Sequence, residues 1–225
     1  RTVMLYLEGI KDGRRFLEAA RRFTRRKPLV AVQGGRTLAG AKAALAHTGS
    51  LAGQYRLTKA LFQQAGIILA RDLEEMIDFA KILAFQPLPR GPRVGIVSIS
   101  GAAAVMASDA TVEAGLVVAS LAPERLGYFQ KLLPDWALAT HPIDLEPLIE
   151  RVGVYEGYRL GLEAVLLEPG VDMCLLFIGA GLYRESEERL VAGLAPLLRR
   201  SEKPLAIVLA GAKPALPDVP LVIGL

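Results

Sequence analysis

Short apolar runs alternate with amphipathic stretches along the chain, and this alternation constrains the fold more than any other feature of the sequence. Runs such as 28–33 and 172–178 are almost entirely apolar, which is typical of strands that are buried on both faces of a sheet. The stretches between such runs carry apolar residues at helical spacing. The sequence therefore predicts an α/β fold, in which crossover helices cover a parallel sheet.

A proline-rich stretch interrupts this alternation. Residues 86–92 read Gln-Pro-Leu-Pro-Arg-Gly-Pro, and prolines at this density stop a helix and stiffen the connection. The alternation restarts at once with the apolar run 93–98. We therefore expect two doubly wound domains, 1–86 and 92–225, with ligands beyond the carboxyl ends of their strands. Because the chain opens with Arg and reads as a strand almost at once, we also expect a fragment of a longer polypeptide.

Composition argues against several classes of protein. The formal net charge of +4 suits anionic ligands, but no dense basic stripe indicates a nucleic-acid partner. Cys174 is the single cysteine, which excludes an internal disulfide or a cysteine metal cluster and favours a reducing, cytoplasmic compartment. No apolar stretch reaches the roughly 20 residues of a membrane span. We expect no membrane partner and no metal ligands.

The segment 34–53 is the most informative part of the sequence. It reads as a Gly- and Ala-rich loop of about 20 residues, and loops of that length are usually functional or disordered. It contains His47, followed by Thr48, Gly49 and Ser50 just before an expected helix. Small residues with free N–H groups at a helix start bind anions, and a neutral imidazole beside them could accept a phosphoryl group. On spacing alone, His47 could equally well just hydrogen-bond the loop to the core.

A longer pattern surrounds this histidine. It consists of Lys27-Pro28-Leu29-Val30-Ala31-Val32, Gly35-Arg36, Ala39-Gly40-Ala41 and His47-Thr48-Gly49-Ser50-Leu51-Ala52-Gly53. This pattern resembles the phosphohistidine loop of NDP-forming acyl-CoA synthetases, a family that includes ADP-forming acetyl-CoA synthetases and is related to succinyl-CoA synthetase. In that family the histidine carries a phosphoryl group between an acyl phosphate and a nucleotide. The resemblance implies that His47 is phosphorylated and that Thr48, Gly49 and Ser50 bind the phosphate.

A second segment, Tyr6-Leu7-Glu8-Gly9-Ile10, resembles the place where the family positions a glutamate near the phosphohistidine. The resemblance assigns this role to Glu8, which would accept a hydrogen bond from the imidazole nitrogen that is not phosphorylated. Such a bond fixes the tautomer and leaves the other nitrogen nucleophilic. Without the resemblance, Glu8 is more simply a solvated residue that caps the next helix.

The second half of the chain opens with a strand, a small-residue turn and a helix over residues 91–110. This stretch resembles the start of the ligase domain in the same family, where a helix N-terminus points at the phosphohistidine. Carried over, the phosphate donors are the N–H groups of Ser100, Gly101 and Ala102. Relatives have more glycine here, whereas positions 102–104 are all alanine, so we expect a tighter turn or an altered site. An ordinary turn without a ligand is the alternative.

His141-Pro142-Ile143-Asp144-Leu145 resembles an Asn-Pro-(Val/Ile)-Asp segment of the family, with His in place of Asn. A side chain before proline is held extended, so we expect His141 to be structural rather than a second phosphoryl carrier. Asp144 is either a turn-former or a site residue.

The resemblance covers nearly the whole chain and implies two tandem flavodoxin-like domains, a phosphohistidine domain at 1–86 and a second ligase domain at 92–225. The implied reaction is acyl-CoA + phosphate + NDP ⇌ acid + CoA + NTP, through an acyl phosphate and phospho-His47. The resemblance also implies an oligomer with a CoA-binding domain upstream and an ATP-grasp domain or subunit. CoA, ATP or ADP, and Mg²⁺ would bind mainly on those parts.

Two other functions remain open. A regulatory or acetyltransferase-fused relative would sense acyl-CoA without phosphoryl transfer; the presence of His47 speaks against it, and the alanines at 102–104 speak mildly for it. A structural α/β module that only joins subunits would bury His47 away from any cleft that an anion can reach.

Overall fold

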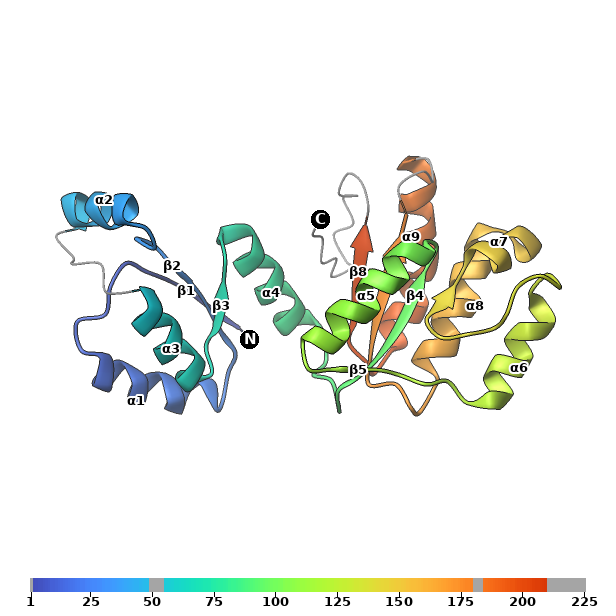
Figure 1. Cartoon of the computed structure of the whole chain (residues 1–225), viewed down its shortest axis with the longest axis horizontal. Coiled ribbons are helices and arrows are strands. Elements are labelled where there is room, and N and C mark those ends of the chain that lie inside the picture. Colours follow the sequence, from blue (N-terminus) through green and yellow to red (C-terminus); the bar gives the residue numbers. More distant parts are fainter. Residues whose placement is uncertain (1, 49–54, 180–183, 210–225) are drawn as a thin grey trace. The chain divides into compact units, whose positions relative to one another are not determined.

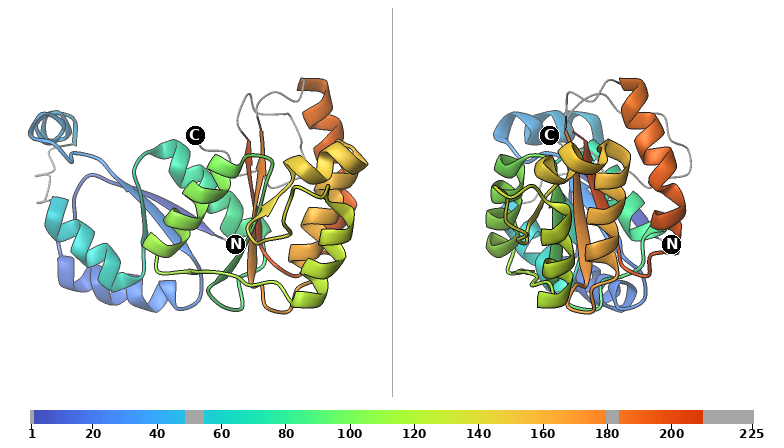
Figure 2. Two further views of the ribbon diagram at one scale, coloured as in Figure 1. Left: turned by 45° about the vertical axis from the view of Figure 1, so that its right-hand side comes forward. Right: turned by 90° about the vertical axis from the view of Figure 1, so that its right-hand side faces the viewer.

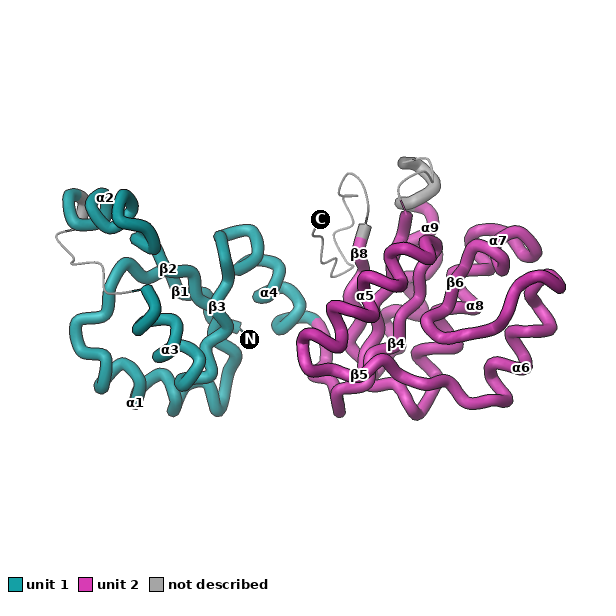
Figure 3. Tube along the Cα trace, viewed as in Figure 1, with its two compact units in different colours: residues 1–85 teal, residues 86–225 magenta. Residues whose placement is uncertain are grey.

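Two parallel β-sheets form the framework of the chain (Figure 1). The computed structural model describes residues 2–48, 55–179 and 184–209. The chain divides into two compact units, unit 1 at Arg1–Phe85 and unit 2 at Gln86–Leu225 (Figure 3). The division falls where the proline-rich stretch begins. An α/β fold with parallel sheets was predicted from the alternation, and the structure confirms it.

Unit 1 is a three-stranded parallel sheet with strand order β1-β2-β3. Helices α1 and α3 cover one face, and α4 covers the other. The elements are β1 (Val3–Leu7), α1 (Gly13–Thr24), β2 (Leu29–Gln33), α2 (Leu38–Thr48), α3 (Tyr55–Ala65), β3 (Ile68–Ala70) and α4 (Leu73–Phe85).

Strand β2 lies in the middle of this sheet, and all five of its residues are buried. Alternate side chains of a strand point to opposite faces. Leu29 and Ala31 accordingly pack with Phe62 of α3, whereas Val30 and Val32 pack with Met76 of α4. The core of unit 1 is therefore built as two layers around one apolar strand.

The loop that we expected over 34–53 is wrong for residues 38–48, which form helix α2. The helix begins after Thr37, whose side-chain Oγ1 accepts a hydrogen bond from the Gly40 N–H at 3.1 Å. A threonine in this position is a preferred helix cap, and the alanines that come next are the strongest helix formers. The content of glycine and small residues suggested a loop, but the helix cap at Thr37 and the alanines favour a helix more strongly than Gly40 disfavours it.

Unit 2 is a five-stranded parallel sheet with the order β5-β4-β7-β8, in which β6 also pairs with β4. Figure 2 shows α5 on one face of this sheet and α8 and α9 on the other. The elements are β4 (Arg93–Ser98), α5 (Gly101–Glu113), β5 (Val117–Val118), α6 (Pro123–Leu132), β6 (Ile143–Asp144), α7 (Glu146–Val152), α8 (Val154–Leu166), β7 (Met173–Ile178), α9 (Arg184–Arg200) and β8 (Leu205–Leu209).

Two short elements of unit 2 leave little signal in the sequence. Strand β6 is only two residues long, too short to give a periodic signal. Helix α7 carries Pro147 in its first turn, where proline is tolerated because that N–H has no helical partner. Cys174 is buried in β7, and none of the described helices is long and apolar enough to span a membrane.

Charged side chains at the amino end of this sheet are paired with one another. The Asp172 carboxylate accepts hydrogen bonds from the Arg93 N–H at 3.0 Å and from its guanidinium at 2.8 and 2.9 Å. These bonds lower the pKa of Asp172 to about 2. Glu168 similarly accepts from the Arg125 guanidinium at 3.1 Å. We interpret this end of the sheet as structural, which leaves the carboxyl ends of the strands for ligands.

His141 fills a gap along the edge of β4. Strand β5 pairs with β4 at Arg93 and Val94, and β6 pairs with it at Val97 and Ser98. Between these pairings, the Ile96 N–H donates to His141 Nε2 at 2.9 Å. The imidazole thus replaces a missing strand partner. Its Nε2 must carry no proton in order to accept this hydrogen bond, which agrees with the structural role expected for His141. Burial lowers the pKa of His141, and the Ala119 carbonyl partly offsets this effect.

We predict that acid selectively weakens this part of unit 2. Because the folded pKa of His141 lies below its ordinary value of about 6.5, its stabilisation is complete above that pH and is lost as pH falls through the folded pKa. Urea unfolding at pH 7.5 and 5.0 should show a loss of about 1–3 kcal/mol that the His141→Asn variant does not share. Equal losses in both proteins would contradict this assignment.

Candidate functional site

Of the polar residues predicted in unit 1, Glu8 lies just beyond the carboxyl end of a strand, next to the end of the neighbouring strand. Glu8 follows β1 and Gly34 follows β2. The strands run in parallel register with Leu7 opposite Gln33, and the Gly34 N–H donates to the Leu7 carbonyl at 2.8 Å. This bond holds the two strand ends together at the edge of the sheet where a doubly wound fold binds ligands.

Glu8 is half-buried and is oriented by a neighbouring tyrosine. The Tyr6 hydroxyl donates to Glu8 Oε1 at 3.3 Å. Partial burial, the negative charge of Glu8 and this hydrogen bond together raise the pKa of Tyr6, so the phenol remains a donor at neutral pH. The sequence indicated Glu8 but not Tyr6. The spacing of the two residues was the available signal, since residues i and i+2 of an extended chain lie on the same face.

Gly34 joins this pair to the segment that carries the predicted histidine. A Cβ atom at position 34 would overlap the Tyr6 hydroxyl and would lie 3.5 Å from Glu8 Cγ. The backbone that leaves β2 therefore passes directly against the Tyr6–Glu8 pair, and a larger residue at position 34 would have to displace the Tyr6 hydroxyl. Four residues later the same backbone enters α2.

His47 lies in the last turn of α2, and Thr48 is the final residue of that helix. Gly49 and Ser50 lie outside the described residues. The carbonyl groups at a helix C-terminus carry partial negative charge, so the end of α2 offers acceptors rather than donors to a phosphoryl group. Donors for such a group must therefore come from other parts of the chain.

In unit 2, Ser100 caps α5. Its hydroxyl accepts from the Ala103 N–H at 3.3 Å, and its own N–H donates to Ser98 Oγ at 3.0 Å. Among the described residues, the N–H groups of Gly101 and Ala102 have no partner. These two N–H groups are the donors that remain for a ligand.

The alanines at 102–104 adopt ordinary helical geometry. Helix α5 begins at Gly101, and no described residue other than glycine has a positive φ. The tighter turn that we expected from the missing glycines is therefore not needed.

A carboxylate lies close to the start of α5. A Cβ atom at Gly101 would lie 3.6 Å from Asp144 Oδ2, and Asp144 Oδ1 accepts from the Glu146 N–H at 3.0 Å. Like charges repel at such distances. The binding of an anion at Gly101 and Ala102 would be weakened by Asp144 at neutral pH.

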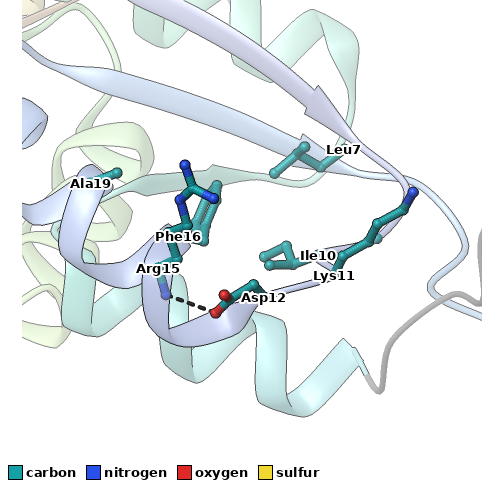
Figure 4. A pocket seen from close by; sticks show the side chains of 8 residues that line it. Leu7, Ile10, Lys11, Asp12, Arg15, Phe16 and Ala19 are labelled. Carbon is teal, nitrogen blue, oxygen red and sulfur yellow. Dashed lines mark hydrogen bonds between the residues drawn. The ribbon is translucent and has the colours of Figure 1, made fainter.

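A cavity of about 330 Å³ adjoins the connection from β1 to α1 (Figure 4). Its apolar wall includes Leu7, Ile10 and Phe16, while Lys11 and Arg15 add positive charge. The Asp12 side chain is used as the cap of α1, where it accepts from the Arg15 N–H at 2.9 Å. Among the described residues, no group of His, Cys, Asp or Glu side chains could hold a metal ion.

Fold and geometry together define unit 1 as a flavodoxin-like α/β domain whose polar groups gather at the carboxyl ends of its strands. Residues 1–83 match the family described as succinyl-CoA ligase like flavodoxin domain. Over 94% of its length the chain is 32% identical to the alpha subunit of acetate–CoA ligase [ADP-forming] II from Pyrococcus furiosus, of which it covers 46%. Over 80% it is 34% identical to acetate–CoA ligase [ADP-forming] II from Archaeoglobus fulgidus, of which it covers 26%.

A solved structure shows the same relationship. The dinucleotide-forming acetyl-coenzyme A synthetase 1 of Ca. Korarchaeum cryptofilum, in complex with phosphate and ADP, superposes with a TM-score of 0.76 at 30% identity. The match covers 94% of this chain and 45% of that one. Residues 1–83 thus belong to the succinyl-CoA ligase like flavodoxin family, and the chain as a whole is similar to ADP-forming acyl-CoA synthetases, although it spans less than half the length of these relatives.

We predict that Gly34→Ala destabilises unit 1 because the added methyl group meets the Tyr6 hydroxyl. The cost should be about 1–3 kcal/mol in urea unfolding, and it should fall when Tyr6→Phe removes the hydroxyl, as measured by a double-mutant cycle. Gly127→Ala is the matched control, since a Cβ there meets nothing within 4 Å. Additive costs for Gly34→Ala and Tyr6→Phe would show that the two residues do not touch.

Proposed function

We propose that this chain is the phosphoryl-relay part of an ADP-forming acid–CoA ligase, with His47 as the residue that carries the phosphoryl group. The observation on which this depends is the Tyr6–Glu8–Gly34 contact. It places a carboxylate at the carboxyl end of β1 against the backbone that leads into α2, and His47 lies in the last turn of that helix, nine residues beyond its first residue. The ADP-forming relatives, and the phosphate and ADP in one related structure, support this proposal.

The proposed chemistry needs a neutral imidazole and a leaving carboxylate. One imidazole nitrogen of His47 attacks the phosphorus of an acyl phosphate, an N–P bond forms, and the P–O bond to the acyl group breaks to release the acid. The other nitrogen keeps its proton and donates it in a hydrogen bond to Glu8, which stabilises the positive charge of the phosphorylated ring. A terminal oxygen of ADP then attacks the same phosphorus and restores the imidazole.

Residues 1–86, which include unit 1, are proposed as the phosphohistidine domain, and residues 92–225, most of unit 2, as the second ligase domain. Thr48, Gly49 and Ser50 are proposed as phosphate-binding residues in unit 1, and Gly101 and Ala102 as donors in unit 2. The relative in Pyrococcus furiosus is an alpha subunit, so a partner subunit or domain of ATP-grasp type is proposed to bind ATP or ADP with Mg²⁺. CoA is proposed to bind on a further domain of the intact protein.

A second candidate function is a regulatory homologue that binds acyl-CoA without transferring phosphate. The Asp144 carboxylate beside the start of α5 favours it, since it opposes anion binding there. Phosphorylation of the intact protein separates the two candidates because a sensor takes no label.

We predict that radiolabelled acetyl phosphate labels the intact protein and that His47→Ala abolishes this label. Glu8→Gln should slow labelling by about 10²-fold, since the tautomer of the imidazole is no longer fixed. Glu18→Gln on the exposed side of α1 makes the same change of charge and should label normally. Acid lability of the label would identify phosphohistidine, and labelling that persists in His47→Ala would refute the assignment.

A further inference from the structure

Gln33 is a buried side chain that the proposed function has not used. It ends β2 and is only 2% exposed. Neither its Oε1 nor its Nε2 has a hydrogen-bond partner in the described part of the chain. Buried carboxamides are normally paired, because an unmade hydrogen bond carries a full desolvation cost. This exception therefore calls for a ligand or another cause.

The position of Gln33 in the strand determines which face it occupies. Leu29 and Ala31 of β2 belong to the layer that packs against α3. Because side chains alternate along a strand, Gln33 projects into that same layer. It is the last residue of the strand, so it lies at the carboxyl end of the sheet.

Helix α3 directs its N-terminus to this same end. Its last residue, Ala65, accepts a hydrogen bond from Thr24 at the end of α1, at 2.6 Å, and the chain then enters β3 at the amino end of the sheet. Thr58 is buried one turn before Phe62 and on the same side of the helix. The first turn of α3, whose N–H groups have no partners within the helix itself, therefore lies toward the end of β2 that carries Gln33.

These two features suit the same ligand. The N-terminus of a helix favours anions, and the carboxamide of Gln33 supplies two N–H donors. A phosphoryl group carries a charge of about −1.5 to −2 and needs donors that the carbonyl end of α2 does not supply. A neutral amide meets this need without leaving a buried charge when the phosphoryl group has departed.

We propose that Gln33 is a phosphate-binding residue whose carboxamide N–H donates to the phosphoryl group as it is transferred to and from His47, beneath the first turn of α3. This inference rests on the proposed phosphoryl relay and adds a residue to it. It also accounts for the unpaired amide, since the missing hydrogen-bond partner would be the phosphoryl group during its transfer.

The test compares Gln33→Met, which keeps the length of the side chain but removes its polar atoms, with Gln33→Glu, which keeps the shape but repels phosphate. Gln64→Met on the exposed side of α3 is the control. The first measurement is the rise in melting temperature of the intact protein in inorganic phosphate over chloride at equal ionic strength. The second is the rate of labelling of His47 by acetyl phosphate.

We expect Gln33→Met to melt at the same or a higher temperature than the natural protein, because an unpaired amide is removed. It should lose the phosphate-dependent rise and label at least tenfold more slowly, and Gln33→Glu should label more slowly still. Gln64→Met should behave as the natural protein. A purely structural glutamine would give the opposite pattern, a lower melting temperature with unchanged labelling, and would overturn the proposal.

Other outcomes separate this proposal from the relay itself. If the natural protein takes no label but its melting temperature rises in phosphate through Gln33, the anion site stands and the relay is wrong. If the natural protein labels on His47 and both Gln33 variants label equally fast, the relay stands and the role of Gln33 is refuted. If Gln33→Met does not fold, the labelling rate of Gln33→Glu tests the proposal instead. Normal labelling of that variant would refute the role of Gln33.

Discussion

The burial of strand β2 is the constraint on which unit 1 depends. Its apolar side chains pack into two layers, one under α3 and one under α4. A shift of the strand by one residue would move every side chain to the opposite layer, so the register of the strand is fixed. That fixed register also positions the residues at the end of the strand. It brings Gln33 to the carboxyl edge and sets Gly34 against the Tyr6–Glu8 pair. The candidate site is thus a consequence of how the core is packed.

Much of this framework could be predicted because it rests on periodicity. The alternating pattern predicts the α/β class and most strands, and the position of Glu8 after an apolar run places it at a strand end. The failures have a different origin. Helix α2 was missed because its glycine content was given more weight than its cap at Thr37. Strand β6 was missed because two residues carry no period.

The candidate site was harder to predict than the fold because its properties depend on direction and on pairing. The sequence identifies His47 but does not show that it lies at the carbonyl end of a helix, where the backbone disfavours a phosphoryl group. It identifies Ser100 but does not show that Ser98 already accepts from its N–H. Gln33 resembles any polar residue at the end of a strand until its burial without a partner is seen. These are facts of three-dimensional arrangement that no motif contains.

His141 and Gln33 both carry side-chain atoms that are shielded from solvent, and they differ in how these atoms are paired. His141 accepts a hydrogen bond at Nε2 from the Ile96 N–H and completes the edge of β4, although its Nδ1 has no hydrogen-bond partner among the described residues; the burial of this side chain is thus compensated in part, and it serves stability. Gln33 has no such compensation among the described residues, and its burial makes the folded state less stable than an apolar side chain would. Selection for stability alone would replace Gln33 by an apolar residue. In the proposed relay, the phosphoryl group supplies this compensation while it is being transferred, and this would distinguish the end of β2 from the edge of β4.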